Sequence, residues 1–111
     1  MAGPSAALQA DAVLGALGDP TRRAVLQAVA EQGPLTATDL ARPTGISRQA
    51  MSKHLAVLQQ AGLVRAERVG REARYEVVPG SLDAATAWLD RVGSAWDRRL
   101  TRLRRHVTGD T

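Results

Sequence analysis

The chain has 111 residues and a formal net charge of +4, and its hydrophobic fraction of 44% includes no Phe, one Tyr and two Trp. It contains no Cys, which excludes disulfide scaffolds, thiolate metal sites and cysteine nucleophiles and fits a reducing cytoplasm. No apolar run approaches the roughly 18 residues that cross a bilayer, and the first residues lack a secretion-signal pattern. The length predicts one domain, and the positive charge indicates a polyanionic partner.

Two helices are predicted in the first third of the chain. Apolar residues between Ala10 and Leu17 recur at helical spacing, and Gly18 is expected to end this first helix. Asp19-Pro20 is an N-cap followed by proline at the first helical position. A second helix is therefore expected to run to about Glu31.

Two more helices, joined by a tight turn, are predicted next. Thr36 can cap a short helix around residues 37–41, and residues 43–45 contain the Pro and Gly of a turn. Ser47 can cap a fourth helix that runs to about Gln60. The apolar residues stacked on one face of that helix are Met51, Leu55 and Leu58.

The pattern changes after Gly62, which is placed to end the fourth helix. Residues 64–69 and 73–78 are short Val-containing runs joined by Gly70-Arg71-Glu72, which predicts a β-hairpin. Ser81 is expected to cap a last helix of more than 20 residues. The predicted fold is mainly α with a small β-hairpin, in the order of a winged helix-turn-helix with five helices and a wing.

Several segments resemble regulators of the ArsR family. Residues 39–55, from Asp39-Leu40-Ala41 through the turn to Ser52-Lys53-His54-Leu55, closely resemble the helix-turn-helix of that family. Residues 17–23, residues 58–64 and the Arg-rich hairpin are similar to it too, so the resemblance covers roughly residues 8–107. It implies a transcription factor that binds duplex DNA as a homodimer, and the match is closest to metal-independent members that repress their own operon.

The expected organisation is a flexible leader (residues 1–5), one DNA-binding and dimerisation domain (residues 6–108) and a short tail (residues 109–111). A protein of this kind is expected in the cytoplasm, associated with the nucleoid. We expect no membrane association, no cofactor and no metal. No recognisable motif identifies an inducer, so the prediction is an unknown inducer or none.

The N-terminal turn of the fourth helix and the hairpin carry the predicted DNA contacts. Side chains at the start of a recognition helix meet base edges in the major groove. Arg48 can pair with guanine and Gln49 with adenine, while Ser47 and Ser52 suit phosphates. For an arbitrary basic helix a solvated face is the commoner explanation, but this motif favours DNA contact. The predicted DNA-binding residues are Ser47, Arg48, Gln49, Ser52, Lys53, His54, Arg68 and Arg71.

Four arginines gather around Gly70 in the predicted hairpin. An Arg at a glycine-bearing tip can enter a minor groove or hold the DNA backbone, which favours Arg71. For Arg65 and Arg74, cross-strand pairing with Glu is equally expected. His54, beside the apolar face of its helix, fits semi-buried packing or a phosphate contact.

The last helix presents an apolar stripe that is longer than a small domain can cover, which indicates packing against a second copy. The resemblance implies that the first and last helices form this interface. A two-fold dimer would place its recognition helices about 34 Å apart on a near-palindromic operator. The predicted interface residues are Leu8, Leu14, Leu89, Val92, Trp96, Leu100 and Leu103.

Other functions find little support in the sequence. The segment where ArsR-like sensors carry metal-binding Cys is Thr38-Asp39-Leu40-Ala41, and the last helix offers only His106 with distant Asp residues. No nucleophile elbow or phosphate loop is present, so no enzyme is predicted. The alternative to a DNA-binding regulator is a winged-helix module that binds another protein, because the fold alone does not decide between them.

Overall fold

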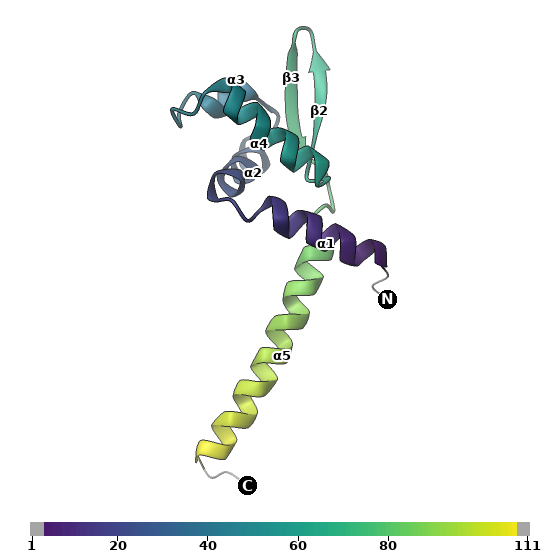
Figure 1. Ribbon diagram of the computed structural model, residues 1–111, viewed down its shortest axis with the longest axis vertical. Helices are drawn as coiled ribbons and strands as arrows, with labels where there is room; N and C mark the ends of the chain where they lie inside the picture. Colours follow the sequence, from purple (N-terminus) through teal and green to yellow (C-terminus); the bar gives the residue numbers. More distant parts are fainter. Residues whose placement is uncertain (1–3, 109–111) are drawn as a thin grey trace.

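The computed structural model describes residues 4–108 and confirms a mainly helical chain with a small antiparallel sheet (Figure 1). The helices of this part are α1 (Pro4–Ala16), α2 (Pro20–Gln32), α3 (Ala37–Ala41), α4 (Arg48–Gln60) and α5 (Asp83–Thr108). The strands are β1 (Leu35–Thr36), β2 (Val64–Val69) and β3 (Glu72–Val77). The predicted tail, residues 109–111, and residues 1–3 of the predicted leader lie outside the described residues.

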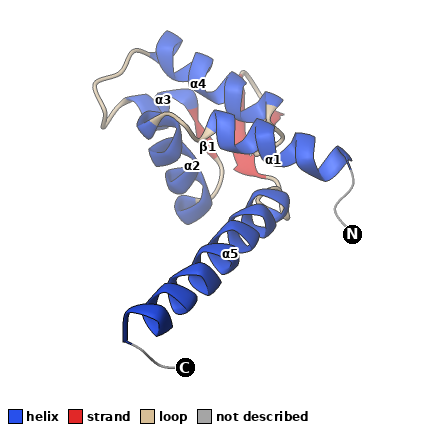
Figure 2. Cartoon of the chain, turned by 60° about the horizontal axis from the view of Figure 1, so that its bottom comes forward, coloured by secondary structure: helices blue, strands red, loops and turns tan. Residues whose placement is uncertain are grey.

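The core lies where helices α1 to α4 meet the base of the sheet, and α5 leaves this group (Figure 2). The three apolar residues predicted on one face of α4 are fully buried, so that face anchors the helix in the core. Because the buried side of an amphipathic helix fixes which side faces water, this packing also sets the exposed surface of α4. The fully buried residues of α4 and the following segment are Met51, Leu55, Leu58 and Leu63.

The predicted N-caps of α2, α3 and α4 are all present. Asp19 accepts a hydrogen bond from the Arg22 backbone N–H, and Ser47 accepts one from the Ala50 backbone N–H, each at 3.1 Å. Thr36 and Asp39 form a reciprocal capping box with both bonds at 3.0 Å. These caps satisfy backbone donors that the first turn of a helix leaves free.

Gly62 ends α4 as the sequence predicts. Its φ is 78°, in the left-handed region that a side chain disfavours. Its N–H donates to the Gln59 carbonyl and the Leu63 N–H donates to the Leu58 carbonyl, each at 3.0 Å, which is the paired bonding of a Schellman motif. The motif turns the chain directly from α4 into buried Leu63 and Val64 at the start of the wing.

A strand that the sequence did not reveal joins the wing to the helix-turn-helix. Strand β1 pairs antiparallel with β3, with Leu35 opposite Tyr75 and Thr36 opposite Arg74, so the sheet order is β1-β3-β2. Two residues are too few to show an alternating pattern, and their pairing partner lies some forty positions away. The wing is thus hydrogen-bonded to the segment that immediately precedes α3.

Three boundaries differ from the prediction. Helix α1 begins at Pro4, so residues 4 and 5 are helical rather than part of a leader. The hairpin loop contains only Gly70 and Arg71, because β3 begins at Glu72. Ser81 does not cap the last helix: α5 begins at Asp83, and the buried Ser81 Oγ has no hydrogen-bond partner among the described residues.

Helix α5 extends far beyond the domain. The radius of gyration is 18.7 Å, whereas a compact chain of this length is expected to have about 13 Å. Its N-terminal part packs against α1, and Ala85 is its only buried residue. No helix among the described residues is long and apolar enough to span a membrane.

Candidate nucleic-acid interface

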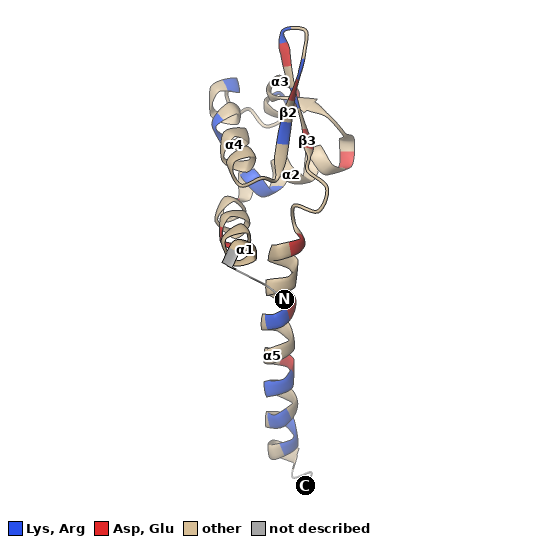
Figure 3. Ribbon diagram, turned by 90° about the vertical axis from the view of Figure 1, so that its right-hand side faces the viewer, with Lys and Arg blue, Asp and Glu red and all other residues tan. Residues whose placement is uncertain are grey.

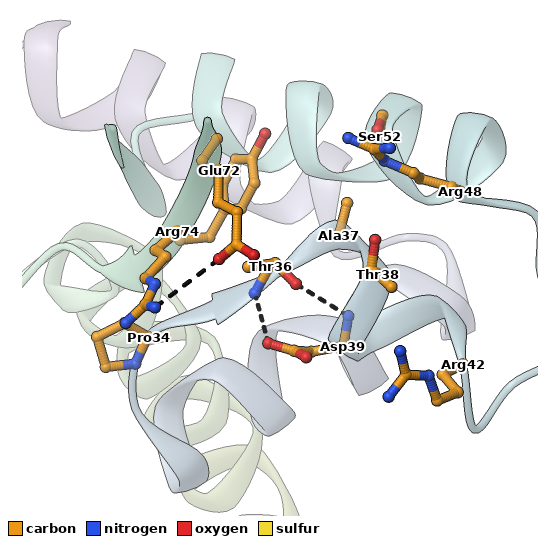
Figure 4. Close-up of a pocket in the computed structure, with 12 residues that line it drawn as sticks. Pro34, Thr36, Ala37, Thr38, Asp39, Arg42, Arg48, Ser52, Glu72 and Arg74 are labelled. Atoms are coloured by element: carbon orange, nitrogen blue, oxygen red, sulfur yellow. Dashed lines mark hydrogen bonds and ion pairs between the residues drawn. The ribbon is translucent and has the colours of Figure 1, made fainter. Parts of the chain in front are cut away.

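The exposed residues at the start of α4 divide into two groups. With Met51 held in the core, the 100° step of a helix turns Gln49 and Lys53 directly away from the domain. Arg48 and Ser52 lie on the side of α4 that faces α3 and the wing (Figure 4). Ser47 is exposed and its hydroxyl is used as the N-cap.

His54 lies on a different side of α4. It is half-buried, whereas Gln49 and Lys53 are exposed. This partial burial agrees with the packing role that the sequence predicts for His54. Its contact with DNA stays a prediction.

The wing arginines fall into two groups: two lie beside a Glu carboxylate and two do not, within the described residues. Arg65 and Glu76 are directly opposite in the sheet, and their side chains form an ion pair at 2.7 Å. Arg74 lies 3.7 Å from the Glu72 carboxylate. Arg68 and Arg71 are exposed and form no ion pair within residues 4–108, so their guanidinium groups are available for an outside partner.

A polar hollow of about 450 Å³ lies between α3, the start of α4 and β3 (Figure 4). The side chains that line it include three arginines, two carboxylates and three Ser or Thr hydroxyl groups, and Tyr75 also lines it. No local sequence pattern marks this site, because its residues come from three separate segments of the chain. The charged and hydroxyl-bearing residues are Thr36, Thr38, Asp39, Arg42, Arg48, Ser52, Glu72 and Arg74.

Basic residues lie on the start of α4, along the wing and along α5 (Figure 3). Two other arginines have structural roles. The Arg22 Nε donates to the Ala16 carbonyl at 2.6 Å, and an Arg23 guanidinium N–H donates to the Leu17 carbonyl at 2.7 Å. These bonds satisfy carbonyls at the C-terminus of α1, so Arg22 and Arg23 are already occupied within the fold.

The apolar stripe on α5 is exposed along its length. Side chains of Leu89 and Trp96 are 53% and 54% exposed, and on α1 Leu8 is 69% exposed. Leu14 differs, because it is half-buried and packs against the core of its own domain. The other predicted interface residues, all exposed, are Val92, Leu100 and Leu103.

Two helix-capping carboxylates are held in their ionised form. The backbone N–H of Arg22 lowers the pKa of Asp19, with further contributions from the Thr21 N–H and nearby positive charges. The backbone N–H of Thr36 lowers the pKa of Asp39, and the charges of Arg42 and Arg74 act in the same direction. Hydrogen bonds to a carboxylate favour its charged form, which is why both values fall.

These lowered pKa values predict a loss of stability in acid. A carboxyl whose folded-state pKa lies below its unfolded value of 3.8 stabilises the fold fully above that value, and the effect is lost as the pH falls through the folded pKa. Asp19→Asn keeps a capping side chain but removes the titration. Urea denaturation between pH 7 and pH 3 should therefore show a smaller loss of stability in acid for this variant than for the wild type.

The matched control is Asp11→Asn, because Asp11 is exposed and its carboxylate accepts no hydrogen bond within the described residues. The control should follow the wild-type pH profile. If Asp19→Asn also follows it, the cap does not couple folding to protonation.

An exposed polar helix start, a neighbouring hairpin with accessible arginines and a supporting helical core define a winged helix-turn-helix protein. A family model described as a helix-turn-helix domain matches residues 17–67, which include α2 to α4 and the first four residues of β2. Among residues 4–108, no cluster of three or more His, Asp or Glu side chains is placed to hold a metal ion.

Two curated relatives share most of their length with the chain. The HTH-type transcriptional regulator Rv2034 of Mycobacterium tuberculosis is 43% identical over 86 residues, which are 78% of this chain and 77% of the relative. The transcriptional repressor SdpR of Bacillus subtilis is 34% identical over 77 residues, which are 69% of this chain and 84% of the relative. Both are named as transcription factors rather than enzymes.

Solved structures agree with the fold. An ArsR-like transcriptional regulator from Rhodococcus sp. RHA1 is 38% identical with a TM-score of 0.70, covering 88% of this chain and 92% of that one. A homodimeric winged helix-turn-helix domain from Mycobacterium bovis, described as a possible ArsR-family regulator, is 30% identical with a TM-score of 0.64, covering 85% and 91%. The chain belongs to the ArsR family of transcriptional regulators.

Proposed function

We propose that this protein is a repressor of its own operon that binds a near-palindromic operator as a homodimer and needs no metal. The observation that carries the proposal is the pairing of two surfaces on one small domain. One is the polar start of α4 beside the wing, and the other is the exposed apolar stripe of α5. The first suits DNA and the second suits another copy of the chain.

The proposed DNA contacts follow from exposure and chemistry. Gln49 faces outward and can pair with adenine, while Arg48 carries the planar donors that match guanine. We assign Lys53 and the hydroxyls of Ser47 and Ser52 to phosphates on either side. On the wing, Arg68 and Arg71 are the arginines without an ion pair in the described part of the chain, so we assign them to the adjacent groove or backbone.

The proposed homodimer rests on the surface of α5. Leu89, Val92 and Trp96 are followed eleven residues later by Leu100, Leu103 and Val107. An eleven-residue repeat corresponds to 3.67 residues per turn, which is close to the period of a straight α-helix. The stripe therefore stays on one side of α5 along its length. Such a stripe in water is unfavourable until a partner covers it. The homodimeric Mycobacterium bovis neighbour supports the same assembly.

Repression is the simplest outcome of operator binding by such a dimer, because a protein seated on promoter DNA excludes other proteins from it. The relative SdpR is named a repressor, which supports this assignment. Metal-independent action is supported by the absence of Cys from the sequence and by the chemistry of the segment 38–41, whose one carboxylate, Asp39, is engaged in the α3 capping box. We place the protein with the chromosome in the cytoplasm.

Fluorescence anisotropy tests the proposal directly. The protein is titrated onto a duplex from its own upstream region and onto a scrambled duplex of the same composition, each at several salt concentrations. We expect the upstream duplex to bind at least about a thousandfold more tightly, with affinity that falls steeply as salt rises. Equal affinity for the two duplexes contradicts autoregulation. Binding without salt dependence contradicts DNA recognition and supports a protein-binding module instead.

A further inference from the structure

We propose that the hollow between α3, α4 and β3 seats one backbone phosphate of the DNA in each half-site, held by Arg42 with help from the Thr38 hydroxyl. We call this site the phosphate hollow. The inference rests on the proposed function, since it assumes that DNA lies against the start of α4. It adds DNA contacts to those proposed for the start of α4 and for the tip of the wing.

The walls of the phosphate hollow come from three elements. Thr38 and Arg42 belong to α3 and its C-terminal cap, Arg48 and Ser52 to α4, and Arg74 to β3 (Figure 4). The pairing of β1 with β3 places Arg74 opposite Thr36, directly before α3. The arginines therefore line one hollow because of the fold, although Arg42 and Arg74 are 32 positions apart in the chain.

The charges in the phosphate hollow are not balanced internally. Three arginines face two carboxylates, a difference of +1. Asp39 is occupied, because it accepts the Thr36 backbone N–H at 3.0 Å, while Glu72 lies 3.7 Å from the Arg74 guanidinium. Within residues 4–108, Arg42 forms no ion pair. The Thr36 backbone N–H is the main cause of the lowered pKa of Asp39, and the charges of Arg42 and Arg74 contribute in the same direction.

The position of the phosphate hollow favours a DNA strand as the source of the phosphate. A recognition helix in the major groove and a wing in the adjacent groove lie on opposite sides of one phosphodiester backbone. The hollow lies between the start of α4 and β3, where that backbone would cross. Guanidinium groups bind phosphate oxygens with several donors at once, which suits Arg42 for this contact.

The first test compares Arg42→Gln with the wild type by anisotropy on the operator and the scrambled duplex. Losing one phosphate contact should weaken binding to both duplexes by a similar factor of about ten and reduce the salt slope by about one. Glu72→Gln removes a negative charge from the same site and should raise affinity a few-fold. Opposite effects of two substitutions in one hollow cannot come from partial unfolding.

The matched control is Arg98→Gln, which removes an exposed arginine from α5 with the same change in net charge. It should bind both duplexes like the wild type. If Arg42→Gln behaves like this control, the phosphate hollow is not a DNA contact.

The decisive test neutralises single phosphates with methylphosphonate along each strand of the duplex. At one position in each half-site, the substitution should weaken wild-type binding about tenfold but leave Arg42→Gln unaffected, because the contact is already lost. Equal losses for both proteins at every position overturn the inference. If operator and scramble bind equally, autoregulation fails, but the salt slope of Arg42→Gln can still be compared with that of Arg98→Gln on either duplex, so the two failures are distinguishable.

A free phosphorylated ligand is the other source of the same chemistry. Inorganic phosphate is therefore titrated against the protein–DNA complex, with chloride at equal ionic strength as the reference. We expect no displacement beyond the chloride effect. Displacement that Arg42→Gln abolishes, together with methylphosphonate losses that do not depend on Arg42, assigns the hollow to a free phosphate and overturns the DNA proposal.

Discussion

Trp96→Asp is expected to convert the proposed dimer into a monomer and to lower operator affinity by at least about a hundredfold. A charge at the middle of the α5 stripe would have to be desolvated against the apolar side chains of the second copy. A monomer then reads one half-site, and the gain from holding two sites together, about 10² to 10⁴ in affinity, is lost. Sedimentation equilibrium measures the association state, and anisotropy measures the affinity.

Ser94→Asp is the control on the same helix. Ser94 lies roughly 160° around α5 from Trp96, so it carries the same new charge on the side opposite the stripe. This variant should remain dimeric and bind DNA normally. Both positions are exposed in the single chain, so neither substitution disturbs the core of the domain. A dimeric Trp96→Asp protein would show that the stripe is not the interface.

Gln49→Ala and Arg48→Ala should each remove discrimination at one base pair per half-site, at a cost of about 1–3 kcal/mol. Gln49 projects straight outward from α4, and Arg48 lies at the edge of the phosphate hollow, where it can still reach a base. The measurement is affinity for a set of operator duplexes that differ by one base pair. Each variant should lose the wild-type preference at a different position.

Two further variants serve as a comparison and a control for this result. Arg71→Ala at the wing tip should weaken binding to every duplex and reduce the salt slope while keeping the base preferences, because a backbone or groove contact carries little sequence information. Gln59→Ala, exposed near the far end of α4, should change neither. Base preferences that remain intact in both Gln49→Ala and Arg48→Ala would mean that other residues read the operator.

The helices were predictable because their ends depend on neighbouring residues. Asp19, Thr36 and Ser47 each accept a hydrogen bond from an N–H three positions later, so the signal is complete within a few residues. Ser81 shows the limit of this reasoning. Its residue type suits a cap, but the chain after Gly80 makes further turns before α5 begins, and the hydroxyl ends up buried.

The features that could not be predicted from the sequence depend on contacts between distant segments of the chain. The phosphate hollow exists only because β3 brings Arg74 beside α3, and no local pattern marks Arg42 as its partner. The two alternatives for Arg65 were separated only by the strand register, which sets it opposite Glu76. Leu14 fits the helical period of α1 but is turned partly inward, because α1 packs against both α4 and α5.

The short pairing of β1 with β3 also has a mechanical meaning. It joins the middle of β3 to Thr36, the residue that caps α3, so the wing and the helix-turn-helix are expected to tilt together as one rigid unit. The 26-residue α5, about 39 Å long, then connects each of these units to the proposed dimer interface. Any signal that releases the protein from its operator is therefore expected to change the angle between the two α5 helices. The distance between the two DNA-binding units would then change, while the structure of each unit would not.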